Sequence, residues 1–237
     1  MAATKNKSNQ TFFQKLKTFL WKAFLWFLGI SFFFVLLYKW LPVPFTPLMV
    51  TRAIEQKFAG EEMTCSHTWV PIEEISPNIQ KAVMASEDGT FLSHHGFDFS
   101  SMQKAIKNNE RGKKIKGGST ISQQTAKNVF LWQGRNYIRK GLEAYFTVLI
   151  EIFWSKERIM EVYLNSIEMG NGVYGVQAAG NYWYKTDANN LTKIQAAGIA
   201  AILPNPRKFK ASNSSSYINK RKGKIMQNMR YIGEIKY

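Results

Sequence analysis

Apolar and polar positions divide the chain into one long apolar stretch and a series of shorter amphipathic ones. Residues 19–40 are almost wholly apolar and aromatic, and their only charged side chains, Lys22 and Lys39, lie near the two ends. A stretch of this length can span a bilayer as a helix, with the long basic side chains reaching the interface. We therefore predict a transmembrane anchor. The alternative is a cleaved signal peptide, but the residues that follow lack a small-residue cleavage pattern.

Basic residues on one side of this stretch predict its orientation. Five lysines precede or open it, and the first 40 residues contain no acidic side chain. The positive-inside rule then places the N-terminus in the cytoplasm and everything after Trp40 outside. Three prolines between residues 42 and 47 predict a short, stiff linker. The expected organisation is a basic cytoplasmic tail (1–18), an anchor (19–40), a Pro-rich linker (41–48) and a functional domain (49–237).

The outer domain shows mainly helical periodicity, and strand signals are sparse. Residues 69–75, which include Pro71, predict an extended or irregular segment. Loops are expected at 107–118 and 169–173, which are rich in Gly and Asn. The fold class is therefore predicted to be mainly α, with helices at 49–59, 77–86, 120–130, 138–154, 156–165, 175–182 and 191–203.

The net charge of the chain indicates which classes of molecule it can bind. The formal net charge is +16, from 32 Lys and Arg against 16 Asp and Glu. The first 40 residues hold six lysines and no acids, so the outer part keeps 26 basic residues against 16 acidic ones, or +10. Genomic nucleic acid is not found outside the cell, so anionic lipid or a phosphate-bearing substrate is the expected partner. The single cysteine excludes an internal disulfide framework.

Residues 85–98, ASEDGTFLSHHGFD, place two adjacent carboxylates and two histidines in one short segment. Glu87 and Asp88 follow an apolar helical pattern, so we expect Glu87 at or just beyond a helix end. His94 and His95 could bind a metal, but adjacent histidines usually point in different directions and no third ligand stands at a typical spacing. We prefer a structural or hydrogen-bonding role for His94.

Residues 116–128, KGGSTISQQTAKN, form a second candidate site. Two glycines precede a predicted helix start, and Thr120 with Gln123 has capping-box spacing. The N-terminus of such a helix can receive an anion. Basic residues along and after the helix could clamp a diphosphate, namely Lys127, Arg135, Arg139 and Lys140. The alternative is a capped surface helix whose basic side chains are merely solvated.

A second carboxylate, Glu143, shares a predicted helix face with Arg139 and Lys140. An ordinary ion-pair ladder explains this spacing, and it suits Glu151 as well. Two separated carboxylates, Glu87 and Glu143, beside a basic cluster would also suit chemistry at a sugar carbon. One carboxylate would deprotonate an attacking hydroxyl while the cations take a departing phosphate.

One apparent motif is rejected. Ser101 and Lys104 spell SxxK, the acylating motif of penicillin-binding transpeptidases. Lys185 and Thr186 are followed by Asp187 instead of glycine, and the only SxN, at 76–78, lies on the wrong side of the serine. We therefore expect no transpeptidase activity.

These motifs together resemble the monofunctional biosynthetic peptidoglycan glycosyltransferases, family 51, whose domain also occurs in class A penicillin-binding proteins. The resemblance runs from about residue 43 to the C-terminus. Four motifs match in order: EDxxFxxHxG from Glu87, GGSTIxQQxxKN from Gly117, RKxxExxxxxxxE from Arg139, and KxxxxExYLN from Lys156. Any one of these motifs is weak, but four in order are highly specific.

The resemblance implies a lysozyme-like, two-lobed, mainly helical fold with a jaw that dips into the membrane. It implies polymerisation of lipid II onto a growing glycan strand, with release of undecaprenyl diphosphate and inversion at the donor carbon. Glu87 would be the general base, with Asp88 supporting it, and Glu143 would act on the donor side, through Mg²⁺ or Mn²⁺ or through the cationic clamp. The expected substrate-binding residues are Asp88, His94, Ser119, Thr120, Gln123, Gln124, Lys127, Asn128, Arg135, Arg139 and Lys140.

The linker is similar to that of Gram-negative members, which implies an inner-membrane protein with a periplasmic domain. Membrane lipid and cell-wall synthesis or division proteins would be further partners. Two rival hypotheses remain: a peptidoglycan-cleaving enzyme with one acidic glutamate, and a non-catalytic scaffold that binds anionic lipid. A cleaving enzyme has no need of a diphosphate clamp, so Lys127 and Arg135 argue against it.

Overall fold

A computed structural model describes residues 2–100, 103, 118–134 and 136–237, with side chains from residue 12 onward. The chain divides into two units, Met1–Leu41 and Pro42–Tyr237. Several predicted features lie outside the described residues. These are Ser101 and Lys104, most of the loop predicted at 107–118, and the candidate ligand Arg135.

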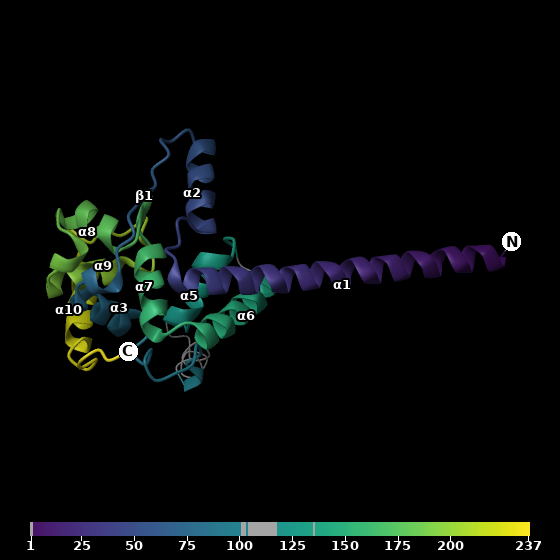
Figure 1. Ribbon diagram of the computed structural model, residues 1–237. Coiled ribbons are helices and arrows are strands. Elements are labelled where there is room, and N and C mark those ends of the chain that lie inside the picture. Colours follow the sequence, from purple (N-terminus) through teal and green to yellow (C-terminus); the bar gives the residue numbers. More distant parts are fainter. Residues whose placement is uncertain (1, 101–102, 104–117, 135) are drawn as a thin grey trace. The chain divides into compact units, whose positions relative to one another are not determined.

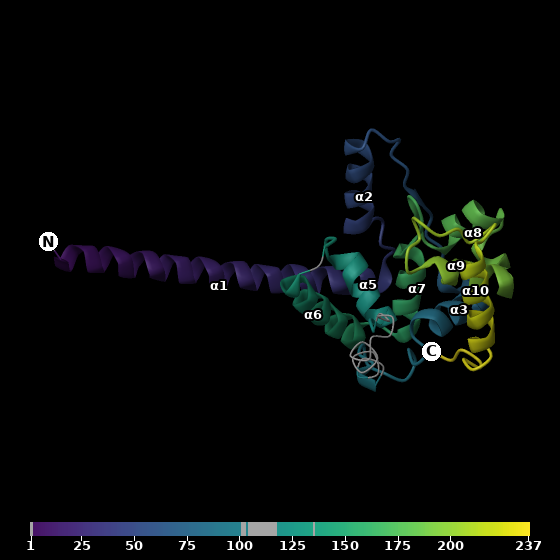
Figure 2. The same ribbon diagram turned by 180° about the vertical axis from the view of Figure 1, so that it is seen from behind.

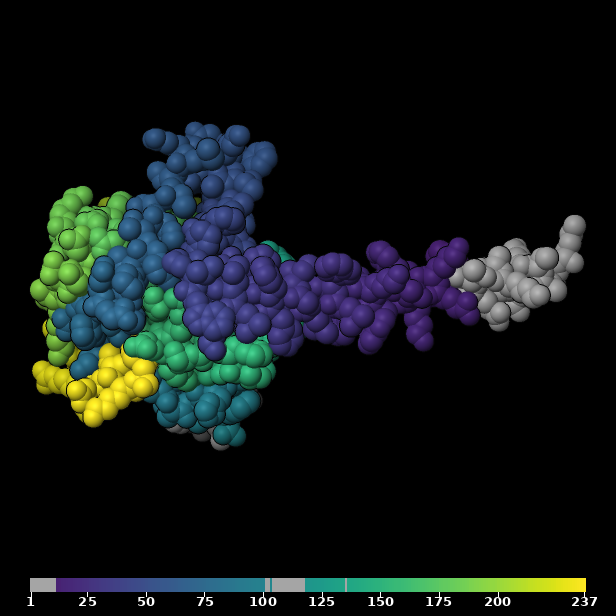
Figure 3. All heavy atoms as spheres, in the orientation of Figure 1, coloured from purple at the N-terminus to yellow at the C-terminus, as the bar shows by residue number. Residues whose placement is uncertain are grey.

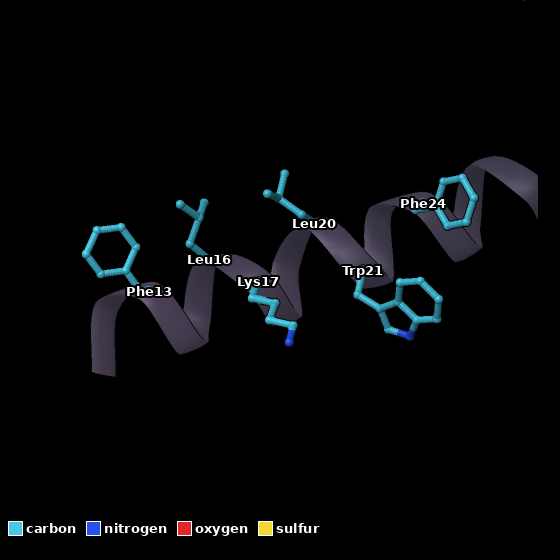
Figure 4. Close-up of a pocket in the computed structure, with 6 residues that line it drawn as sticks. All are labelled: Phe13, Leu16, Lys17, Leu20, Trp21 and Phe24. Carbon is cyan, nitrogen blue, oxygen red and sulfur yellow. The ribbon is translucent and has the colours of Figure 1, made fainter. Parts of the chain in front are cut away.

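The first unit is a single helix, α1 (Ala2–Trp40). Among the described residues it alone is long and apolar enough to cross a membrane, over Phe12–Trp40. Figure 4 shows a shallow apolar hollow on it, where Phe13, Leu16 and Leu20 project from one side while Lys17 and Trp21 project from the other. These side chains belong to one exposed helix, as expected of a segment that meets lipid.

The second unit begins with α2 (Pro47–Phe58), which starts earlier than the helix predicted at 49–59. Thr46 caps it by accepting a hydrogen bond from the Met49 N–H at 3.3 Å, and Pro47 takes the first helical position. Proline suits that position because its missing N–H would be unpaired there anyway. The last residues assigned to the stiff linker therefore belong to this helix. In Figures 1 and 2, α2 and the chain after it project from the rest of the second unit.

The helices expected in the rest of the domain are present, and the mainly α class is confirmed. The 3₁₀ helix η1 (Ile72–Glu74) occupies the segment predicted to be irregular, and η2 (Ala188–Asn190) precedes α9. Within the described ranges, one α-helix was missed: α10 (Ser216–Asn228), which Ser215 caps and which buries Ile218 and Ile225. The others are α3 (Pro77–Glu87), α5 (Ile121–Phe130), α6 (Tyr137–Phe153), α7 (Lys156–Ser166), α8 (Val176–Tyr184) and α9 (Lys193–Ile202).

A small sheet stands where a loop was predicted at 169–173. Its strands are β1 (Ser66–His67), β2 (Glu168–Gly170) and β3 (Val173–Tyr174), in the order β1-β3-β2. β2 and β3 are antiparallel, and Gly172, with φ of +69°, makes the turn between them. β1 pairs with β3 in parallel, from more than 100 residues away. Strands this short leave almost no periodic signal in the sequence.

Two groups of helices form the core. α5 packs against α6 and α7, and α9 packs against α3 and α10 (Figure 1). The side chains of α9 from Ala196 to Ile202 are nearly or wholly buried, as are Ile159, Met160 and Tyr163 of α7. Figure 3 shows the outer surface of the same unit. The C-terminal end of α3, from one group, contacts the N-terminal end of α5, from the other group. The candidate site lies at this contact.

Candidate active site

The end of α3 presents Glu87 and Asp88. Glu87 is the last helical residue, and Asp88 is the C-cap, with its backbone N–H donating to the Met84 carbonyl at 2.9 Å. Asp88 is buried, and its Oδ2 accepts a hydrogen bond of 3.0 Å from the Ile121 backbone N–H, the first of α5. His94 Nε2 lies 3.0 Å from both Asp88 oxygens. The preferred hydrogen-bonding role of His94 is confirmed.

Thr120 and Gln123 form the capping box that the spacing predicted. Thr120 Oγ1 also donates to the Gly96 carbonyl at 2.6 Å, which ties the loop after α3 to the start of α5. Asp88 accepts from the Ile121 N–H and Thr120 from the Gln123 N–H, so the N-terminus of α5 already holds an anion, the carboxylate of Asp88. The expectation that this helix end receives a ligand anion finds no support in these contacts.

Glu87 is partly buried, with 16% of its side chain exposed. Its Oε1 accepts a hydrogen bond of 2.8 Å from Ser86 Oγ, and Arg221 Nη2 lies 3.4 Å from the same oxygen. Its Oε2 faces α5, where Gln124 Nε2 lies 3.4 Å away. One oxygen of the carboxylate is thus held by Ser86 and Arg221, and the other oxygen points toward α5.

Tyr163 of α7 sets the orientation of Gln124. The phenol donates to Gln124 Oε1 at 3.3 Å, which turns the amide nitrogen toward Glu87. Burial, with help from the charges of Glu87 and Asp88, raises the pKa of Tyr163 well above its ordinary value. The hydroxyl therefore stays protonated and acts as a donor at every pH at which the protein works.

Lys127, Arg139 and Lys140 form a cationic cluster around Glu143. Glu143 is buried and makes an ion pair with Lys140 Nζ, while Arg139 Nη1 lies 3.8 Å from its other oxygen. Burial lowers the pKa of Lys127. The charges of Glu143 and Glu87 raise this pKa, whereas those of Arg139 and Lys140 lower it further. Lys127 is therefore within electrostatic range of both candidate carboxylates.

A second layer of contacts supports these residues. Glu151 of α6 accepts hydrogen bonds from Ser122 of α5 and from Lys156 Nζ, the latter at 2.8 Å. Lys156 also lies 4.7 Å above the ring of Phe91. Gly96, with φ of +84°, sits so close to α6 that a Cβ there would lie 2.8 Å from Thr147 Cγ2. These contacts fix the loop after α3 against α5 and α6.

Most of the predicted site residues come together. Glu87 is hydrogen-bonded to Gln124, Asp88 is hydrogen-bonded to His94, and the cationic cluster surrounds Glu143. Ser119 lies next to them, with its carbonyl 3.5 Å from Gln124 Nε2, and Asn128 is buried on α5. Thr120 and Gln123 are committed to the cap, and Arg135 lies outside the described residues.

Sequence reasoning missed Ser86, Tyr163 and Arg221 as members of the site. Tyr163 stands in the fourth motif, KxxxxExYLN, which was a usable signal. Arg221 lies in the basic run KRKGK, which gives no hint of a contact with a residue 134 positions away.

The described residues do not form a protein-held metal centre. No three His, Cys, Asp or Glu side chains gather there, and Glu143 is already paired with cations. A dedicated Mg²⁺ or Mn²⁺ site needs several oxygen ligands, so such a site does not fit this part of the chain.

A helical domain that carries a partly buried carboxylate and, on neighbouring helices, a cluster of cations suits enzymes that act on phosphate-linked sugars. The family model described as Transglycosylase matches residues 55–230, and the chain belongs to that family. The resemblance seen in the motifs, with its lysozyme-like fold class, is thereby confirmed.

Relatives of known name are similar over nearly the whole chain. A biosynthetic peptidoglycan transglycosylase of Pseudomonas syringae pv. syringae is 52% identical over 91% of this chain and 92% of its own length. Relatives with the same name in Bdellovibrio bacteriovorus and Caulobacter vibrioides are 54% and 55% identical, over 90% and 81% of this chain and 85% and 81% of theirs.

Proposed function

We propose that this chain is a peptidoglycan glycosyltransferase that polymerises lipid II into linear β-1,4 glycan strands. Undecaprenyl diphosphate leaves, and the donor anomeric carbon inverts. The observation that carries the proposal is that Glu87 faces α5, where Gln124 Nε2 lies 3.4 Å from its Oε2, while the same helix carries Lys127 and the neighbouring α6 carries the cations that surround Glu143. A base and a leaving-group clamp thus share one site, which a glycosyl transfer from a diphosphate requires.

Glu87 acts as the general base. Its carboxylate removes the proton of the acceptor's 4-hydroxyl as that oxygen bonds to the anomeric carbon of the growing chain. The bond between that carbon and the diphosphate oxygen breaks, and the electron pair leaves with the diphosphate. Attack from the face opposite the leaving group accounts for inversion.

The cationic cluster receives the negative charge that grows on the diphosphate. Arg139 has a side chain that is 11% exposed, and its Nε is buried without a hydrogen-bond partner among the described residues, so it keeps a donor for a ligand. Buried cations stabilise such a charge far more than solvated ones do. Arg135 extends the clamp in our proposal, and Glu143 holds the cluster together on the donor side.

The remaining candidates fall into two groups. Gln124 and Ser119 lie next to Glu87, and we propose that they contact the substrate. Asn128 is buried on α5, so its contact with substrate stays a prediction. Asp88, His94, Thr120 and Gln123 support the site through the contacts that join α3 to α5. We propose that a divalent cation, if one takes part, arrives with the diphosphate, since the chain offers no dedicated cage among its described residues. No step here passes through it.

We further propose a single-pass inner-membrane location, with the N-terminus in the cytoplasm and the domain in the periplasm. The α1 span and the lysines before it support this topology. The domain's charge of +10 suits anionic lipid and a diphosphate substrate, and nucleic acid is not a partner. Cell-wall synthesis and division proteins are proposed as further partners.

The direct test is incubation of the purified full-length protein with labelled lipid II, with and without Mg²⁺. We expect polymer that lysozyme digests, and continued synthesis in EDTA at a reduced or equal rate. A cleaving enzyme would instead shorten preformed glycan, and a scaffold would bind vesicles without making polymer.

A further inference from the structure

Arg221 of α10 reaches the candidate base from a distant part of the chain. Its Nη2 donates to Ser86 Oγ at 2.9 Å and lies 3.4 Å from Glu87 Oε1. Ser86 Oγ in turn donates to the same Glu87 oxygen at 2.8 Å. Oε1 is therefore held by a hydroxyl and a guanidinium together, whereas among the described residues Oε2 has a single contact, with Gln124 Nε2 at 3.4 Å.

We propose that Arg221 is a positioning residue for glycosyl transfer, and that with Ser86 it fixes Glu87 so that Oε2 accepts the acceptor's proton. This inference rests on the proposed function of Glu87. The two oxygens of the carboxylate then have separate tasks, since Oε1 anchors the side chain and Oε2 does the chemistry. A base held within a narrow range of orientations reacts faster than one that rotates freely.

Arg221 and Glu87 are partly buried, which strengthens the electrostatic interaction between them. The side chains of Arg221 and Glu87 are 28% and 16% exposed, so their charges are screened less than those of a surface pair. The Nε of Arg221 is buried and has no hydrogen-bond partner in the described parts of the chain. Among the described residues, this guanidinium therefore makes its polar contacts with Ser86 and Glu87.

Arginine also suits this place chemically. A guanidinium stays protonated throughout the working pH range, so it cannot compete with Glu87 as a base. Its Nη2 carries two N–H groups in fixed directions and contacts both Ser86 and Glu87, whereas the donors of a lysine ammonium rotate freely. The packing of α10 against both α9 and α3 holds the guanidinium at the end of α3.

The test compares Arg221→Ala, Arg221→Lys and Lys220→Ala in the full-length protein with labelled lipid II. Lys220 is the exposed neighbour on α10, so its loss removes the same charge without the contact. We expect Arg221→Ala to lower kcat by about 10- to 100-fold, with KM for lipid II within about twofold. Arg221→Lys should regain part of the rate, and Lys220→Ala should match the wild type.

A second comparison uses the Glu87→Gln background. There Arg221→Ala should cause no further loss, because its effect acts through Glu87. A wild-type kcat in Arg221→Ala would overturn the inference, as would a raised KM at unchanged kcat, which would indicate a substrate ligand. An equal loss in Arg221→Ala and Arg221→Lys with a lowered Tm would overturn it too, because the role would be structural.

These outcomes are separable from failure of the proposed function. If the wild type makes no polymer, the proposed function fails. If the wild type polymerises and Glu87→Gln does not, while Arg221→Ala remains fully active, only the role of Arg221 fails.

Discussion

The backbone N–H of Ile121 donates a 3.0 Å hydrogen bond to the carboxylate of Asp88, 33 residues earlier. This contact joins the end of α3 to the start of α5 and puts a negative charge at the positive end of a helix dipole. It explains why two acidic residues stand side by side. Asp88 fixes the helix end that carries Glu87, and Glu87 faces α5, where we propose that the transfer takes place.

Asp88→Asn tests this division of labour. The amide keeps the shape of the side chain but removes the negative charge that holds the Ile121 N–H and His94. The variant should therefore lose about 1–3 kcal/mol of stability. Polymerisation should fall as well, because Glu87 is displaced. Thermal unfolding and lipid II turnover measure the two effects, with the exposed Glu73→Gln as a charge-matched control. An unchanged Tm in Asp88→Asn would contradict the role given to the contact.

Lys127→Met separates activity from stability. Burial lowers the pKa of Lys127, which means that the charged form is disfavoured where it stands. Methionine removes that cost, so the Tm should stay level or rise, while polymerisation falls by about 10²- to 10³-fold because the diphosphate loses a cation. The exposed Lys57→Met serves as the control. A parallel loss of Tm and activity would indicate that Lys127 is structural.

Glu168, outside the active site, should make stability depend on pH. Burial raises its pKa from 4.5, against the opposing charges of Arg52 and Arg207. The folded state thus holds a proton that the unfolded state has released, so this contribution to stability is complete below about pH 4.5 and is lost as pH rises through the raised value. Glu168→Gln should gain Tm relative to the wild type between pH 4 and pH 8. A constant difference across that range would refute the assignment.

Gly96→Ala tests the close approach of the loop to α6. The residue has φ of +84°, and a Cβ would lie 2.8 Å from Thr147 Cγ2 and 3.0 Å from Glu151 Cγ. We expect a loss of about 1–3 kcal/mol by thermal unfolding. Gly141→Ala is a matched control, because it lies inside α6 with no atom near its Cβ, and it should gain about 0.5–1 kcal/mol. Equal effects at both positions would contradict the structure.

Features with a local cause could be predicted from the sequence. The capping box depends on Thr120 and Gln123, which are only three positions apart. The apolar stripe that buries Phe146 and Leu149 recurs with the helical period. The N-terminal span follows from length and composition alone. The motifs around Glu87 and Glu143 were recognisable because each lies within one short segment.

Features that depend on distant packing were missed. α10 is strongly basic, and only Ile218 and Ile225 mark its buried face, so its helical pattern is weak. β1 gains its pairing from β3, far along the chain, and has only two residues. The contact between Arg221 and Glu87 exists because α3, α9 and α10 pack together, and no spacing in the sequence records that.

The measurement that tests the central claim most directly is lipid II polymerisation by Glu87→Gln in the full-length, membrane-bound protein. Glutamine keeps the size of the side chain and can still accept from Ser86, so folding and membrane association should persist. Without a base, we expect the rate to fall by about 10²- to 10⁴-fold. Polymer formation at the wild-type rate would contradict the assignment of Glu87 and, with it, the mechanism proposed for this site.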